Sequence, residues 1–129
     1  MNPKDIHAQR INRLNQFFDD DIYNFELKPS ESLVWVCLYR HTNWSTGIAT
    51  LAISRIKQHC YLGDKTARRA IKVLCDKKLI KRIKIGTGTR SSIYALLSQD
   101  CYLLPQTKAY LSKKRGYTPD PDDSPNSDE

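Results

Sequence analysis

Residues 62–80, with the sequence LGDKTARRAIKVLCDKKLI, decide how the rest of this chain is interpreted. On a helix, where neighbours lie about 100° apart, the apolar residues of this stretch fall on one side. They are Ala67, Ala70, Ile71, Leu74 and Cys75. The opposite side and its edges carry Lys65, Thr66, Arg68, Arg69, Lys72 and Asp76. A helix that buries one side and directs cations outward near its start suits an anionic surface, so we predict a DNA-recognition helix over residues 64–79.

The charge of the 129-residue chain is unevenly distributed. The net charge is +7, yet residues 118–129 hold five acids and three prolines with no base, which predicts a disordered acidic tail. Residues 1–117 therefore hold all 21 Lys and Arg against nine Asp and Glu, a net charge of +12. A segment with this charge attracts the phosphate backbone of a nucleic acid. The same charge is also compatible with a solvated basic surface that binds no nucleic acid. The placement of several cations on one helix favours nucleic-acid binding over a solvated surface.

Composition and cysteine spacing limit the other classes of function. Apolar content is 40%, no apolar run approaches the roughly 18 residues of a membrane span, and the start MNPKDIHAQ lacks a signal-peptide core. We therefore expect a cytoplasmic protein with no membrane partner. Cys37, Cys60, Cys75 and Cys101 are widely spaced, and the neighbours His59 and Cys60 would point about 100° apart on a helix. We predict no metal site and no cofactor, with Cys37 and Cys75 as reduced core thiols.

Residues 1–28 are predicted to form an N-terminal helix followed by an extended segment. The helix covers residues 3–18, begins at Pro3 and ends at the aspartates 19–21, because three anions crowd the negative end of a helix. Its apolar stripe consists of Ile6, Ile11, Leu14, Phe17 and Phe18. Such a stripe packs either on its own domain or on a second copy of the chain, as a homodimer, and the sequence leaves both open.

Residues 29–98 are predicted to hold the main domain. Ser30 is a favourable N-cap for its first helix, which is apolar nearly all round and should be central in the core. The expected elements are a helix over 31–42, a strand over 47–51, a helix over 53–60, a turn at 61–63, the basic helix, and a β-hairpin with strands over 79–85 and 91–97. Residues 99–117 form an extension with a short helix opened by Pro105.

The order of these elements resembles a winged helix-turn-helix, a fold that is mainly α with a small β-hairpin wing. The resemblance covers residues 31–97 and is carried by SRIKQHCYLGDKTARRAIKVL (54–74), CDKKLIKR (75–82) and GTGTRSSIYAL (86–96). The residues that match the family pattern are Thr66, Arg68–Arg69, Leu74 with Leu79–Ile80, and Tyr94. Lys78 replaces the usual glycine. The chain is similar to the small helix-turn-helix domains of plasmid and phage replication proteins and of bacterial regulators.

The resemblance implies a DNA interface on the basic helix and the hairpin. Side chains near the start of a recognition helix reach base edges in the major groove, whereas the later cations and the wing contact the backbone. The expected base-reading residues are Lys65, Thr66 and Arg69. The expected backbone or minor-groove contacts are Arg68 and Lys72 on the same helix, Arg55 on the preceding helix, and Lys84, Thr87, Thr89 and Arg90 on the wing.

The expected function is that of a non-catalytic protein that binds double-stranded DNA, as a transcriptional regulator or a replication-associated factor. The alternative is a winged helix for protein assembly, whose basic face docks an acidic partner. Catalysis is not expected, because no Ser-His-Asp set, carboxylate pair or metal cluster has a suitable spacing. Tyr110 has no acid–base group beside it for strand nicking, and residues 86–90 lack the G-x-G-x-x-G pattern of a nucleotide-binding loop.

Overall fold

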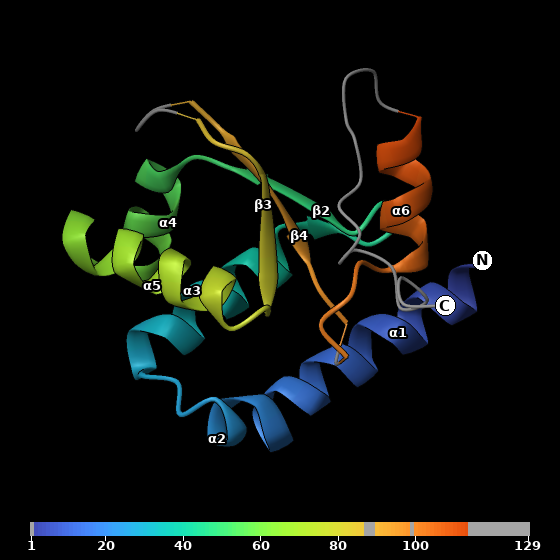
Figure 1. The fold of residues 1–129 in the computed structure, drawn as a ribbon, viewed down its shortest axis with the longest axis horizontal. Helices are drawn as coiled ribbons and strands as arrows, with labels where there is room; N and C mark the ends of the chain where they lie inside the picture. Colours follow the sequence, from blue (N-terminus) through green and yellow to red (C-terminus); the bar gives the residue numbers. More distant parts are fainter. Residues whose placement is uncertain (1, 87–89, 99, 114–129) are drawn as a thin grey trace.

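A computed structural model describes residues 2–86, 90–98 and 100–113 and shows helices packed around one small sheet (Figure 1). The N-terminal elements are α1 (Pro3–Gln16), the π-helical turn η1 (Phe17–Asp21) and α2 (Ile22–Asn24). The main body comprises α3 (Pro29–Arg40), β1 (Thr42–Asn43), β2 (Ile48–Leu51), α4 (Ile53–Cys60), α5 (Asp64–Asp76), β3 (Ile80–Lys84) and β4 (Ser92–Leu96), followed by α6 (Pro105–Ser112). In the described part of the chain, no helix is long and apolar enough to cross a membrane.

The sheet has the strand order β1-β2-β4-β3, and every neighbouring pair is antiparallel. In the β3–β4 hairpin, Ile80 pairs with Leu96, and a register shift between Arg82 and Lys84 marks a bulge. Strand β2 pairs with the other side of β4, so the segment before α4 and the hairpin after α5 share one sheet. The order α3, β2, α4, α5, β3, β4 around this sheet is a winged helix-turn-helix, which confirms the predicted fold class.

Helix α3 lies at the centre of the core, as its apolar sequence predicts. Val34, Trp35 and Leu38 are fully buried, and α4, α5, β2 and β4 all contact the helix. Burial of side chains of this size contributes about 1.5–3 kcal/mol each. Because α4 and α5 pack on the same central helix, α3 fixes the position of the helix-turn-helix pair relative to the sheet.

The first turn of α3 differs from the prediction in its capping residue. The N-cap is Lys28 rather than Ser30, and Pro29 occupies the first helical position. The backbone N–H of Lys28 donates to Oε1 of Glu31 over 2.9 Å, which satisfies a donor at the start of the helix. Ser30 lies inside the first turn, because the proline before it already has the φ that a helix requires.

The N-terminal helix continues through its three aspartates, so the predicted end there is wrong. The π-helical turn η1 and α2 carry the helical path to Asn24, and the residues from 22 to 24 are not extended. Asp21 is buried, and its Oδ2 lies 2.8 Å from Nη2 of Arg13. Asp19 and Asp20 stay exposed. Only one of the three anions therefore enters the fold, and it does so beside a buried cation.

The apolar stripe of α1 divides between the core and the surface. Phe17 is fully buried and stacks on Trp35 with ring centroids 3.7 Å apart, and Leu14 packs against the same core. Ile11 and Phe18, by contrast, are 42% and 54% exposed. The helix thus covers its own domain with one part of the stripe. A homodimer through this helix stays a prediction. The exposed part of the stripe is accessible to a second copy of the chain.

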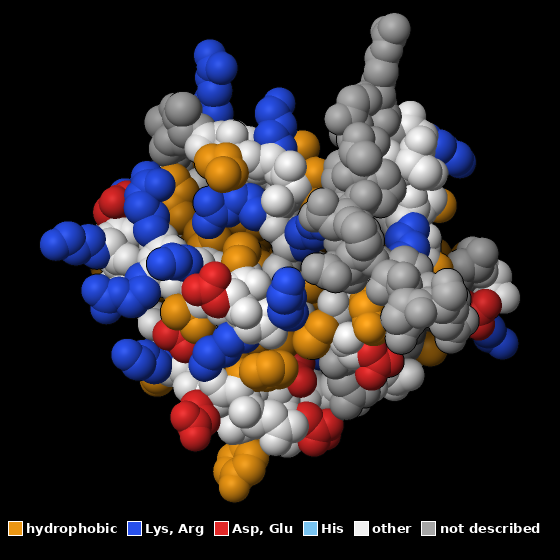
Figure 2. Space-filling model, in the orientation of Figure 1, with side chains coloured by type: hydrophobic (Ala, Val, Ile, Leu, Met, Phe, Trp, Pro, Cys, Tyr) orange, Lys and Arg blue, Asp and Glu red, His pale blue; other side chains and the backbone are white. Residues whose placement is uncertain are grey.

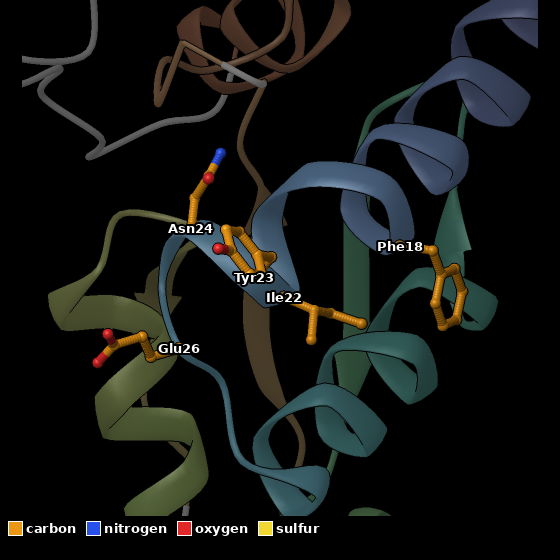
Figure 3. A pocket seen from close by; sticks show the side chains of 5 residues that line it. All are labelled: Phe18, Ile22, Tyr23, Asn24 and Glu26. Carbon is orange, nitrogen blue, oxygen red and sulfur yellow. The ribbon is translucent and has the colours of Figure 1, made fainter.

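The bend after α1 forms an open hollow of about 610 Å³. Its lining side chains spread around the bend rather than converge on one point (Figure 3). They are Phe18, Ile22, Tyr23, Asn24 and Glu26. This geometry is that of an uneven surface rather than of a closed binding cavity.

Candidate nucleic-acid interface

Helix α5 has one buried side and one exposed side. Its buried residues, which pack on α3 and α4, are Ala67, Ala70, Ile71 and Leu74. Gly63 caps the helix in an extended conformation, and Asp64 places a carboxylate in the first turn, where the helix dipole favours an anion. The alternation of buried and exposed positions follows the predicted helical period, although Cys75, predicted as a core thiol, is only partly buried.

The exit of α5 uses lysine where the family pattern has glycine. Lys78 has a φ of 61°, in the left-handed region that glycine favours. The backbone N–H of Leu79 donates to the Leu74 carbonyl over 3.0 Å, and that of Lys78 donates to the Cys75 carbonyl over 3.1 Å. These two bonds form a Schellman motif, which ends α5 at Asp76 instead of the predicted 79 and turns the chain into β3.

The predicted contact residues on α5 all lie on its exposed side. They are Lys65, Thr66, Arg68, Arg69 and Lys72. Lys and Arg side chains gather on this part of the surface, over α5 and toward the hairpin (Figure 2). The structure therefore brings these five residues together on one solvent-facing surface.

The acidic residue Asp64 accepts hydrogen bonds from two cations of this surface. Nε of Arg68 donates to Oδ2 of Asp64 over 2.9 Å, and Nζ of Lys57 on α4 donates to Oδ1 over 3.3 Å. The hydrogen bond from Arg68 is the main reason why the pKa of Asp64 lies below its usual value, and Lys57 adds to the effect. Arg68 is therefore partly neutralised by a residue that the sequence-based site omitted. The spacing of four residues between Asp64 and Arg68 is the signal that could have identified it.

Among the residues that the structure describes, the three other cations of α5 do not share the ion pair that Arg68 makes with an acidic side chain. In the described part of the chain, Lys65, Arg69 and Lys72 have no acidic side chain within ion-pairing distance. All three are exposed. Their positive charge is consequently directed to solvent, where an external anion can reach it.

The predicted wing residues are only partly described. Lys84, at the end of β3, and Arg90, just before β4, are both exposed. Thr87 and Thr89 lie outside the described residues. The end of the hairpin lies on the same side of the molecule as α4 and the start of α5 (Figure 1). Lys84 and Arg90 therefore belong to the strand ends on the side of the molecule that holds α4 and the start of α5.

The connection between β3 and β4 begins with a tight approach of two chain segments. The backbone N–H of Gly86 donates to Oγ of Ser92 over 2.8 Å. A Cβ on Gly86 would lie 2.4 Å from the carbonyl oxygen of Arg90, so only glycine fits here without a backbone shift. This closure holds Lys84 and Arg90 at the same end of the hairpin.

Helix α4 and the turn after it add two further exposed side chains. Arg55 lies on the exposed side of α4, while Ile53, Ile56 and Cys60 hold the helix to the core. Tyr61, in the turn between α4 and α5, has a φ of 59° and a side chain that is 97% exposed. The sequence-based site omitted Tyr61, since nothing in the pattern around a tight turn indicates how far a side chain projects.

The comparisons with known proteins give only a likeness in structure. No protein-family model and no curated protein sequence match the chain. A mutant of S. aureus MepR shares 18% identity, over 87% of this chain and 76% of that one, with a TM-score of 0.45. NMB1585, a MarR family regulator from Neisseria meningitidis, shares 22% identity, over 87% of this chain and 69% of that one, with a TM-score of 0.40. These values carry no weight on function, and the fold assignment rests on the chain's own elements.

Proposed function

We propose that the chain binds double-stranded DNA without catalysis, as a transcriptional regulator, with α5 in the major groove and the hairpin on the backbone. The observation that carries this proposal is the set of cations Lys65, Arg69 and Lys72, which are exposed and lack an acidic partner in the described residues. The buried side of α5 fixes them on a rigid support. A duplex supplies the missing counter-charge through its phosphates. A replication-associated role would use the same interface.

The start of α5 supplies the base-reading residues. A helix in the major groove presents its N-terminal side chains to base edges, which places Lys65, Thr66 and Arg69 there. The guanidinium of Arg69 can donate two hydrogen bonds to O6 and N7 of a guanine, worth about 1–3 kcal/mol of discrimination against other bases. Lys72 follows on the same side of the helix and contacts a phosphate.

Arg68 has a different role in the proposal because Asp64 already accepts a hydrogen bond from it. The carboxylate holds the guanidinium at the start of α5, in an orientation that a phosphate oxygen can share. Arg55 on α4 and the hairpin residues Lys84 and Arg90 reach the backbone on either side. The proposal thus assigns five cations to phosphates and leaves sequence reading to α5.

Fluorescence anisotropy with a labelled random-sequence duplex tests this function. With five phosphate contacts, the logarithm of the association constant should fall with the logarithm of salt concentration with a slope of about −4 to −5. No binding at low salt, or binding that is insensitive to salt, would contradict the proposal. If the chain binds an acidic protein but not the duplex, the result favours the alternative function, a winged helix for protein assembly.

A further inference from the structure

A second hollow, of about 370 Å³, lies between α3 and α4. Its lining residues are Leu33, Val36, Cys37, Arg40, His41, His59 and Cys60. Two cysteines and two histidines therefore line one space, as a pair from the end of α3 and a pair from the end of α4. Cys37 lies on α3 and His41 is the C-cap of that helix four residues later, so the two lie on the same side.

The two thiols of this hollow are buried and line the same space. Cys37 and Cys60 are 7% and 4% exposed. Each thiol lies close enough to the other to affect its pKa, and Sγ of Cys60 lies 3.6 Å from the carbonyl oxygen of Leu33. Burial raises the pKa of Cys37 to about 12, and it also raises the pKa of Cys60. Both groups are therefore protonated at neutral pH and react slowly with oxidants, which need the thiolate.

Two imidazoles and a guanidinium surround the thiols. Nδ1 of His41 lies 4.0 Å from Sγ of Cys37 and 2.9 Å from the carbonyl oxygen of the same residue. The rings of His41 and His59 have centroids 5.1 Å apart. Arg40 also lines the hollow, and its charge acts to lower the pKa of Cys37 against the larger effect of burial. The site thus combines soft sulfur donors with a cation that can balance a thiolate.

We propose that the Cys37 and Cys60 thiols form a binding site for the thiophilic monovalent ion Cu(I) between α3 and α4. On binding, the ion forms a bond to each sulfur and two thiol protons leave to solvent. The product carries one net negative charge, which Arg40 offsets. Thiolates are the ligands that Cu(I) selects, and the two cysteine sulfurs are the donors of the proposed site.

A two-sulfur site is the geometry that the described residues offer. Among them, no three or more His, Cys, Asp or Glu side chains are arranged to hold a metal ion together. A tetrahedral zinc site would require four such donors around one point. The cysteine pair alone satisfies an ion that accepts two sulfur ligands.

The site lies next to the candidate DNA interface. Cys60 is the last residue of α4, and Gly63 caps α5 only three residues later. An ion that fixes the distance between Cys37 and Cys60 also fixes the end of α4 relative to α3. An effect of the ion on DNA affinity would rest on the proposed DNA-binding function. Binding of the ion itself is independent of that function. Retention of Cu(I) is measured without DNA, so the two proposals fail separately.

The test is a titration of the reduced full chain with Cu(I) under anaerobic conditions, in competition with the chromogenic chelator bicinchoninate. We expect one Cu(I) per chain. Because loss of an outer-shell partner alone lowers metal affinity about 10–100-fold, Cys37→Ser and Cys60→Ser should each lower it at least about 100-fold. The matched control replaces Cys75 and Cys101 together by serine and should retain the full affinity.

Three results of the titration would overturn the proposal. They are loss of all Cu(I) from the unmodified chain to the chelator, unchanged affinity in Cys37→Ser or Cys60→Ser, and loss of Cu(I) from the Cys75→Ser, Cys101→Ser control. The control variant keeps only the proposed pair, so the test holds even if a substitution of buried Cys37 unfolds the chain. X-ray absorption of the Cu(I)-loaded control must show two sulfur ligands; a first shell without sulfur would also overturn the proposal.

Discussion

Helices α5 and α1 both carry an apolar stripe, yet they use opposite chemistry to join the core. Helix α5 buries small and branched apolar side chains and leaves its cations in solvent. Helix α1 buries Arg13, which pairs with Asp21 and donates from Nε to the Leu97 carbonyl over 2.9 Å. It leaves the apolar Ile11 and Phe18 exposed. One basic helix is therefore tied into its own fold, while the other presents its charge to the outside.

The comparison distinguishes a cation that stabilises the fold from a cation that is available to bind an external anion. A buried cation is costly unless it is paired and hydrogen-bonded, so Arg13 has one position and a fixed partner. The exposed cations of α5 are solvated at little cost and can exchange water for phosphate. Four predictions can break or sharpen this comparison.

Phe17→Ala should have the largest effect, a loss of about 3–5 kcal/mol in the free energy of unfolding. Phe17 is fully buried and its ring is nearly parallel to that of Trp35, at an interplanar angle of 4°. Urea denaturation measures the loss. The matched control is Phe18→Ala, which should cost less than about 1.5 kcal/mol because that ring is half exposed. An equal loss in both variants would show that the stripe does not divide as described.

Arg13→Ala should destabilise by about 3 kcal/mol, because it leaves the buried carboxylate of Asp21 without its cation. We expect the lower end of the range for broken buried pairs. The 2.8 Å contact is an ion pair, but its atoms do not meet as a well-aligned hydrogen bond. Denaturation of the double variant Arg13→Met, Asp21→Leu should show a smaller loss than the single variant. A larger loss in the double variant would mean that the ion pair is not the cause.

Arg69→Ala should lower affinity for the preferred duplex by about 1–3 kcal/mol and relax the preference at one base pair. Arg90→Ala should instead weaken all sequences similarly, because a backbone contact carries no base information. Site selection from random duplexes, repeated with each variant, measures both effects. Equal loss of preference in the two variants would remove the division between helix and hairpin.

Lys78→Gly should raise the free energy of unfolding by about 1 kcal/mol, since glycine adopts the left-handed conformation without the clash of a Cβ. The control Lys78→Ala removes the same charge but keeps the Cβ, so it should give no gain. Thermal unfolding compares the two. Stabilisation of equal size in both variants would assign the effect to charge rather than to backbone strain.

Sequence alone predicts those parts of the molecule where local pattern decides the structure. The helix over 53–60 has the bounds of α4, and the predicted strands contain β3 and β4. The buried and exposed positions of α5 follow its helical period. In each case the residues that decide the element lie within a few positions of one another, so a single chain segment contains the information.

The parts that sequence did not predict depend on contacts between distant residues. The helix passes the aspartates because Asp21 meets Arg13 inside the fold, and β1 forms only because Thr42 and Asn43 pair with β2. The adjacency of Cys37 and Cys60 likewise requires α3 and α4 to pack together. Tertiary packing creates these features, and no local period marks them.

The central claim is that the cations of α5, and not basic charge in general, bind DNA. The most direct test compares two variants that each lose three exposed cations. One has Lys65, Arg69 and Lys72 changed to alanine on α5, and the other has Lys4 and Arg10 on α1 and Lys113 just after α6 changed to alanine. Duplex affinity is measured across a salt series. We predict that the α5 variant loses about 100-fold or more in affinity and reduces the salt slope by about 1, because only Lys72 of its three cations is assigned to a phosphate, while the other variant changes little. Equal losses in the two variants would contradict this claim.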